Sequence, residues 1–310
     1  MIAIANRRRG RSGLGLITIG LPLLLFAVLA VRAPNFLDLQ NLTNINSQIT
    51  ALMIVALGQM VVALTGGIDL SVGSILSLTS ALLVSVDPSI AIPVALFAGI
   101  VVGLANGSGV AVFGVHPLIM TLASMTFLQG LTLLIHPVPG GTVPAYLMSA
   151  VRFSTGGLPA ALYWCAAAVV TALFVLHKTR FGLRLFALGA NQDSVALSGV
   201  SVVPLRIACY VLCSLASVVA GIFLTGRVGS GDPTIGAPFG LDSVTAVALG
   251  GVQLSGGIGS VIGAVFGTIT LGLMANGMNL LGVSPFIRAA VTGGLLLAAI
   301  SLQRRKVIGV

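Results

Sequence analysis

The sequence predicts an all-α polytopic membrane protein of about ten transmembrane helices with an internal repeat. The first observation is composition: of 310 residues, 57% are hydrophobic and 7% are charged, with a mean hydropathy of +1.13. The second is that the apolar runs are unbroken rather than alternating, which favours helices over a β-barrel. The third is a pair of adjacent glycines that interrupts two of these runs, Gly66-Gly67 and Gly256-Gly257.

Ten apolar runs are expected to cross the bilayer, and the whole chain, 1–310, is expected to form one transmembrane domain. Their approximate ranges are 14–31, 51–64, 74–86, 90–104, 118–135, 158–176, 207–224, 242–254, 260–278 and 285–302. The run 242–254 is short for about 30 Å of hydrocarbon, so a re-entrant or tilted path is its alternative. Spans one to four then match spans seven to ten in direction, with spans five and six between them.

The loops between these runs are assigned to sides by polarity and charge. The polar stretch 35–48 and the loops 136–157 and 226–240 are predicted to lie outside, and 177–206 inside. The net charge of +9 comes mainly from three clusters, at residues 7–11, 178–206 and 304–306. These clusters obey the positive-inside rule and place both termini, 1–13 and 303–310, in the cytoplasm, so nucleic acid is not the expected partner. The exceptions on the opposite side are Arg32, Arg152, Arg227 and Arg288.

The first glycine pair opens the stretch Gly66-Gly67-Ile68-Asp69-Leu70-Ser71-Val72-Gly73. Two glycines end a helix, and an Asp followed by Leu-Ser-Val predicts that Asp69 caps a new one. In lipid such a break is tolerated only where protein or a watery cavity satisfies the freed backbone groups. A shorter copy, Ser255-Gly256-Gly257-Ile258 with Gly263, lies 190 residues further on. Interrupted segments at corresponding positions point to the path of a transported solute.

Few polar side chains fall within the apolar runs. Asp69 and Asp242 are the ionisable ones, and each is either a helix cap or a group that lines or gates a path. The candidates for a translocation path or gate are Gln59, Gly66, Gly67, Asp69, Ser71, Asn106, Gln129, Asp242 and Asn276. Scattered amides predict a passage of low affinity, so another component is expected to select the solute.

Two sets of glycines recur at four-residue spacing, which places each set on one helix face. They are Gly99, Gly103 and Gly107, and Gly259, Gly263 and Gly267. Small residues on one face allow another helix to approach closely, so we expect both sets to pack helices.

The chain lacks the patterns that catalysis requires. The histidines His116, His136 and His177 have no metal-ligand spacing, and the absence of a Gly-Lys pair excludes a phosphate-binding loop. The three cysteines read as buried small hydrophobes. We therefore expect no enzyme activity and no cofactor in this chain, and the shortage of buried titratable groups favours an external energy source.

The motif Gly66-Gly67-Ile68-Asp69-Leu70-Ser71-Val72-Gly73 resembles the ribose-type permease family of bacterial ABC sugar importers. The stretch 116–122, the segments 179–182 and 187–191, and the late segments 241–242, 250–251 and 255–257 are also similar to it. Gly240 departs from the pattern, because family members often carry an acid there. The resemblance implies a bacterial inner-membrane permease whose partners are a cytoplasmic ATPase that binds ATP, a periplasmic sugar-binding protein and a second permease subunit.

The same resemblance implies that the loop 177–206 docks the ATPase. Its coupling residues would be Thr179, Arg180, Phe181, Gly182, Gly189, Ala190 and Asn191. Phe181 would supply an apolar knob, and the alternative is a solvated loop that only orients the chain. Two further alternatives for the whole chain are a branched-chain amino acid permease and a stand-alone channel or secondary carrier.

Overall fold

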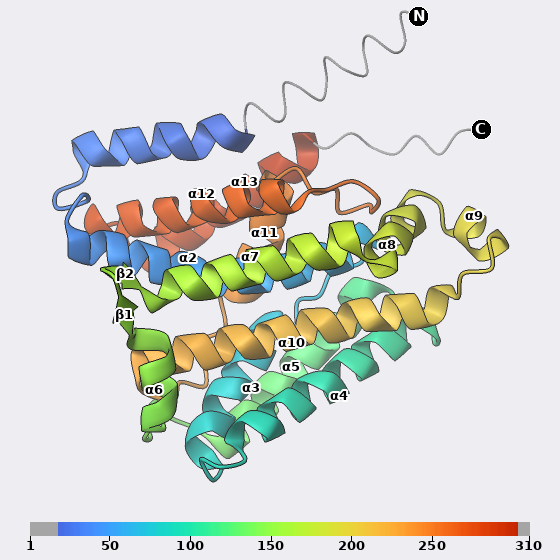
Figure 1. Ribbon diagram of the computed structural model, residues 1–310, viewed down its shortest axis with the longest axis horizontal. Helices are drawn as coiled ribbons and strands as arrows, with labels where there is room; N and C mark the ends of the chain where they lie inside the picture. The colour runs from blue at the N-terminus through green and yellow to red at the C-terminus, as the bar shows by residue number, and fades with distance from the viewer. Residues whose placement is uncertain (1–17, 303–310) are drawn as a thin grey trace, which may run out of the picture.

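The computed structural model describes residues 18–302, so the predicted tails 1–13 and 303–310 lie outside the described residues. The first described helix is Thr18–Arg32. The elements that follow are α2 Leu39–Leu64, α3 Val72–Ser85, α4 Ala91–Ala111, α5 Pro117–Ile135, α6 Ala145–Arg152, β1 Ser154–Thr155, β2 Leu158–Pro159, α7 Ala160–Lys178, α8 Arg180–Ala190, α9 Gln192–Leu197, α10 Val202–Val228, α11 Phe239–Leu249, α12 Val261–Leu280 and α13 Pro285–Leu302 (Figure 1). β1 and β2 form an antiparallel hairpin in which Ser154 pairs with Pro159.

Six of the described helices, α2, α4, α5, α7, α10 and α12, are long and apolar enough to cross a bilayer. Four shorter apolar helices, Thr18–Arg32, α3, α11 and α13, lie where spans one, three, eight and ten were predicted. The chain is therefore an all-α, multi-pass membrane protein, as predicted.

The centre of the bundle is built on α2 and α10. The most apolar window of α2 is 94% buried, and α2 contacts α7, α10, α11 and α12. α10 in turn contacts α3 and α4. The outer helices α5 and α7 are only 17% buried in the corresponding window. Their exposed apolar side chains, such as Phe127 and Val170, suit contact with lipid tails.

Several predicted loops are helical. The polar stretch 35–48 was predicted to lie outside; α2 begins within it at Leu39, and Asn41 in its first turn pairs with Asn276 of α12. The loop 136–157 contains α6 and β1, and the segment 177–206 contains α8 and α9.

The first glycine set packs α4 against α10. A Cβ added at Gly103 would lie 2.5 Å from Val211 Cα, and one at Gly107 would lie 2.7 Å from Ile207 Cα. At Gly99 the added atom would lie 2.6 Å from a methyl group of Val218. Side chains any larger than glycine would hold the two helices apart.

The second glycine set is not on one helix face. α12 begins at Val261 after the N-cap Ser260, so Gly259 lies in the preceding loop, against Val252. Gly263 and Gly267 face α11, where the backbone of Ala246 and Gly250 approaches them. The helix starts later than the spacing predicted, because the Ser260 hydroxyl accepts the Gly263 N–H at 3.0 Å and caps it there.

Candidate functional site

The first break separates α2 from α3 within the bundle. The Thr65 hydroxyl donates to the Val62 carbonyl at 2.7 Å and closes the end of α2. Gly66 then adopts φ +80°, which L side chains rarely adopt. A hollow of about 380 Å³ lies against the break and is lined by Gly66, Gly67, Arg206 and Tyr210, among others. The break therefore borders open space, which is the surrounding that an interrupted membrane helix requires.

Asp69 closes a turn inside the break and is fully buried. Its Oδ1 accepts the Ser71 N–H at 2.9 Å and the Ser71 hydroxyl at 2.6 Å. The N-cap of α3 is Ser71, not Asp69 as predicted, and Ser71 makes no side-chain cap bond. The carboxylate acts two residues earlier because an Asp favours this local turn, in which its side chain mimics a backbone carbonyl.

Side chains from two other helices, α4 and α5, hold this turn. Asn106 of α4 donates to the Ser71 hydroxyl at 2.9 Å and accepts from Ser124 of α5. Thr121 of α5 donates to the Ile68 carbonyl at 3.2 Å. The structure thus brings Ser71 and Asn106 together with Asp69, and adds two hydroxyls that the sequence did not single out.

Gln59 of α2 completes the network from the other side. The side-chain amide of Gln59 is oriented so that both backbone groups of Asp69 find a partner. In this orientation its nitrogen donates to the Asp69 carbonyl at 3.0 Å and its oxygen accepts the Asp69 N–H at 3.1 Å. Gln59 is fully buried. Both backbone groups of Asp69 are therefore satisfied by one side chain from the preceding helix.

Two buried polar atoms next to the break have no hydrogen-bond partner among the described residues. They are Asp69 Oδ2 and the hydroxyl of Tyr210. Tyr210 lies over the break, since a Cβ added at Gly67 would be 2.7 Å from its hydroxyl oxygen. Buried polar groups are rarely left unpaired, so the break carries hydrogen-bonding capacity that the described residues do not use.

The two glycine breaks meet. Gly257 N–H donates to the carbonyl of Leu64, the last residue of α2, at 2.9 Å. A Cβ added at Gly256 would lie 2.9 Å from the nitrogen of Gly66. Segments 190 residues apart in the sequence thus share one contact, and glycine is required on both sides because backbone touches backbone.

The end of α8 reaches the same point. A Cβ added at Gly189 would lie 2.7 Å from Gly257 Cα, and closer still to the carbonyl oxygen of Leu64. We call this contact of Leu64, Gly66, Gly189, Gly256 and Gly257 the glycine junction. Through it, the segment predicted to dock an ATPase touches both breaks directly.

α8 begins at its predicted coupling residues. Thr179 is its N-cap and accepts the Gly182 N–H at 3.4 Å, and Gly182 packs against the Leu176 backbone, where a Cβ would clash. Phe181, the predicted apolar knob, is half-buried and packs partly on the core, so only part of its ring is open to a partner. Leu183, which is 73% exposed, is the apolar side chain that α8 presents outward, beside Arg180.

At the end of α8, Asn191 caps α9. Its Oδ1 accepts the Ser194 N–H at 2.9 Å. Ala190 and Asn191 are exposed, whereas Gly189 is buried in the glycine junction. The predicted coupling residues therefore divide into three groups: Arg180, Ala190 and Asn191 are exposed, Thr179 and Phe181 are partly buried, and the two glycines, Gly182 and Gly189, are buried.

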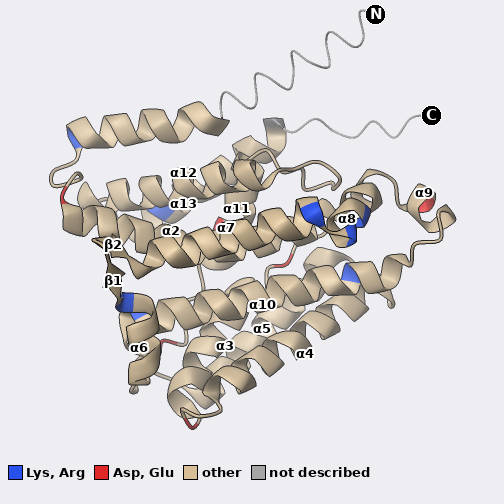
Figure 2. Cartoon of the chain, in the orientation of Figure 1, with Lys and Arg blue, Asp and Glu red and all other residues tan. Residues whose placement is uncertain are grey.

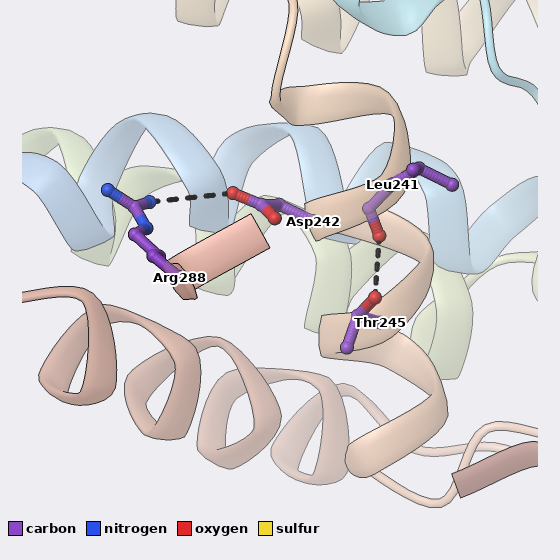
Figure 3. Close-up of polar contacts among 4 residues, drawn as sticks. All are labelled: Leu241, Asp242, Thr245 and Arg288. Carbon is purple, nitrogen blue, oxygen red and sulfur yellow. Dashed lines mark hydrogen bonds and ion pairs between the residues drawn. The ribbon is translucent and has the colours of Figure 1, made fainter. Parts of the chain in front are cut away.

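The remaining predicted path residues lie elsewhere. Gln129 donates to the Pro233 carbonyl at 2.9 Å, and Asn276 forms an amide pair with Asn41 that joins α12 to α2. Asp242, in the first turn of α11, faces Arg288 of α13 at 3.7 Å (Figure 3). Arg288 had been noted only as an exception to the positive-inside rule, and an isolated arginine in an apolar run is the signal that could have marked it.

Comparison with known proteins identifies the family. Residues 41–300 match the family model described as the permease component of the branched-chain amino acid transport system. The ribose import permease protein of Bacillus subtilis is 39% identical over 295 residues, which cover 91% of this chain and 90% of that protein. No solved structure matches the chain.

Two relatives from Escherichia coli K12 extend this result. Its ribose import permease protein is 38% identical over 296 residues, or 92% of each chain. Its L-arabinose transport system permease protein is 36% identical over 294 residues, 91% of this chain and 88% of that protein. The match covers both breaks, the glycine junction and α8, so the chain belongs to the ribose-type permease family, and it is a transporter subunit rather than an enzyme.

Proposed function

We propose that this chain is the membrane subunit of an ATP-binding cassette importer that moves a monosaccharide or a related small polyol into the cytoplasm. The observation that carries this proposal is 36–39% identity, over about nine tenths of the chain, to permeases named for ribose and arabinose import. A separate ATPase would bind and hydrolyse ATP, and a periplasmic binding protein would deliver the sugar.

The glycine junction supports a mechanism in which the breaks are the moving parts. At the glycine junction backbone atoms touch directly, so no side chain can absorb a movement by changing its rotamer. A displacement of α8 would therefore be passed on to the end of α2 and to the second break. The hydrogen bonds of Asp69 with Ser71 and Gln59, and of Ser71 with Asn106, would hold the first break in the conformation seen here. Gly66 and Gly67 would then supply the flexible backbone of a gate.

The charges of the described residues support the partner assignments. Lys178 ends α7, Arg180 and Arg184 belong to α8, and Arg206 lies near the start of α10. Figure 2 shows basic residues in blue at this end of the bundle, on α8 and on the neighbouring end of α10. We place this end in the cytoplasm, where α8 would dock the ATPase. Arg152 donates to the Arg227 carbonyl at 2.8 Å at the opposite end, which would face the binding protein.

The same orientation places both termini in the cytoplasm of a bacterium, with the chain in its inner membrane. We further propose ten crossings with a parallel repeat, lipid against α5 and α7, and a second permease subunit, identical or not, beside this one. Attaching a thiol reagent to single cysteines at Ser198 and Ser149 would test the sidedness, since both side chains are exposed.

The test of the proposed function is uptake into proteoliposomes that contain this chain, its ATPase and its binding protein. We expect uptake of labelled D-ribose, L-arabinose or D-galactose that needs both ATP and the binding protein. Uptake by the chain alone, without ATP, would instead establish a channel or secondary carrier.

A branched-chain amino acid permease is the second candidate, favoured by the description of the matching family model. Labelled L-leucine in the same vesicles distinguishes the two. Leucine uptake without sugar uptake would reject the sugar assignment and keep the importer assignment.

A further inference from the structure

A second hollow lies beside the middle of α2, whereas the first break follows the end of that helix. Its volume is about 240 Å³, and it is lined by residues of α2, α11, α12 and α13 together with Leu224 of α10. Since a water molecule occupies about 30 Å³ in the liquid, the hollow can hold several waters or one small solute. Its polar side chains are Gln48, Asp242, Arg288 and Thr292.

The charged pair in this hollow has unused hydrogen-bonding capacity. The guanidinium Nη2 of Arg288 lies 3.7 Å from Asp242 Oδ2. This distance is longer than the donor–acceptor distance of about 2.7–2.9 Å in a charge-assisted hydrogen bond. The two side chains point toward each other across the hollow (Figure 3). They are 42% and 18% exposed, so neither is closed off by packing. A guanidinium offers five N–H donors and a carboxylate two acceptor oxygens, far more than this one contact uses.

The walls of the hollow are apolar. Phe239, Leu52 and Met274 face it together with the polar groups. Pockets for small molecules combine such walls with a few well-placed polar groups. The opposite charges cancel, so an ion of either sign gains little, whereas a neutral molecule with several hydroxyls can donate to the carboxylate and accept from the guanidinium at once.

We infer that the hollow around Asp242 and Arg288 is a binding site for a neutral polyhydroxylated solute within the membrane part of the protein. One hydroxyl would bridge the gap between carboxylate and guanidinium, with the C–H face of the sugar against Phe239. This inference rests on the proposed function and assigns a place in the chain to its substrate.

The test is protection of a cysteine placed in the hollow. Gln48 is exposed and lines it, so Gln48→Cys would report occupancy through its rate of labelling by a membrane-impermeant thiol reagent. Of the native cysteines, Cys165 is half-buried and is replaced by Ala, while Cys209 and Cys213 are fully buried. The full chain is used with its ATPase in nanodiscs, without the binding protein, over a range of D-ribose and D-galactose concentrations.

We expect the sugars to slow labelling of Gln48→Cys. The matched control is Gln40→Cys, an exposed residue of the same helix that does not line the hollow, and its labelling should not change. Asp242→Ala and Arg288→Ala should each raise the half-protecting sugar concentration about tenfold or more, the effect of losing one hydrogen bond to a charged group.

Three results would overturn the inference. They are no protection by any sugar, an unchanged half-protecting sugar concentration in both charge variants compared with the native pair, or protection by L-leucine but not by sugar. The first does not depend on the folding of any charge variant, because it is measured with the native pair. ATP-dependent sugar uptake together with absent protection would refute this site and leave the proposed function standing. Absent sugar uptake would refute the proposed function itself.

Discussion

Gly189→Ala tests the glycine junction most directly. The added Cβ would stand 2.7 Å from Gly257 Cα, whereas ordinary contact begins at 3.4 Å, so α8 and the second break must separate by at least 0.7 Å. The neighbours are backbone atoms, which cannot rotate away. Overpacking of this kind costs about 1–3 kcal/mol, and weakening the adjacent Gly257 N–H bond to Leu64 adds about 0.5–1.5 kcal/mol.

Helix propensity acts in the opposite direction. Alanine stabilises a helix interior over glycine by about 0.5–1 kcal/mol. The net cost is therefore about 2 kcal/mol, or roughly thirtyfold in any equilibrium that requires the glycine junction to form. The matched control is Gly130→Ala in α5, where an added Cβ meets nothing within 4 Å.

The assay measures ATP hydrolysis and sugar uptake in the same proteoliposomes. We expect Gly189→Ala to assemble with the ATPase but to lose at least about tenfold in sugar moved per ATP, while Gly130→Ala transports normally. If Gly189→Ala fails to assemble, Gly257→Ala approaches the junction from the other side, 2.7 Å from the Gly189 carbonyl carbon. Normal coupling in both variants would refute the reasoning.

Three further predictions concern the turn, the helix packing and the docking surface. Asp69→Asn keeps an oxygen that accepts the hydrogen bonds of the turn, so its thermal midpoint and sugar uptake should match those of the wild type. Asp69→Ala removes that oxygen and should lose about 1–3 kcal/mol of stability. Lost uptake in a stable Asp69→Asn variant would instead show that the charge gates transport. Gly103→Ala places a Cβ 2.5 Å from Val211 Cα and should lower the thermal midpoint in detergent, in contrast to Gly130→Ala. Leu183→Asp places a charge on the exposed face of α8 and should weaken co-purification of the ATPase without changing the thermal midpoint of the isolated chain; unchanged co-purification would move the docking site elsewhere.

The positions of the main helices could be predicted because hydrophobicity along the chain decides them. The boundaries were less predictable where polar residues have distant partners. α2 includes Asn41, whose amide partner is on α12, and nothing near position 41 in the sequence shows this. α8 and α9 differ, because their caps Thr179 and Asn191 each bond to a backbone N–H only three residues ahead, a local signal in a segment that was nevertheless predicted to be a loop.

The candidate site was predicted in part. Gln59, Asp69, Ser71 and Asn106 were selected as scarce polar residues in apolar runs, and the structure joins them in one network. Gln129, Asn276 and Asp242 satisfied the same criterion but lie apart from it, because scarcity identifies a polar residue without identifying its partner. Arg288 was overlooked as a partner for Asp242 for this reason.

The sequence by itself determined that the chain enters the membrane many times, that its helices break at two glycine pairs, and that it resembles ribose-type permeases. These features depend on local physical chemistry: the cost of placing polar groups in hydrocarbon and the backbone freedom of glycine. Only the tertiary structure decided that the two breaks touch each other and the end of α8, and that Asp242 faces Arg288. Those contacts join residues far apart in the chain, so they depend on how whole helices pack.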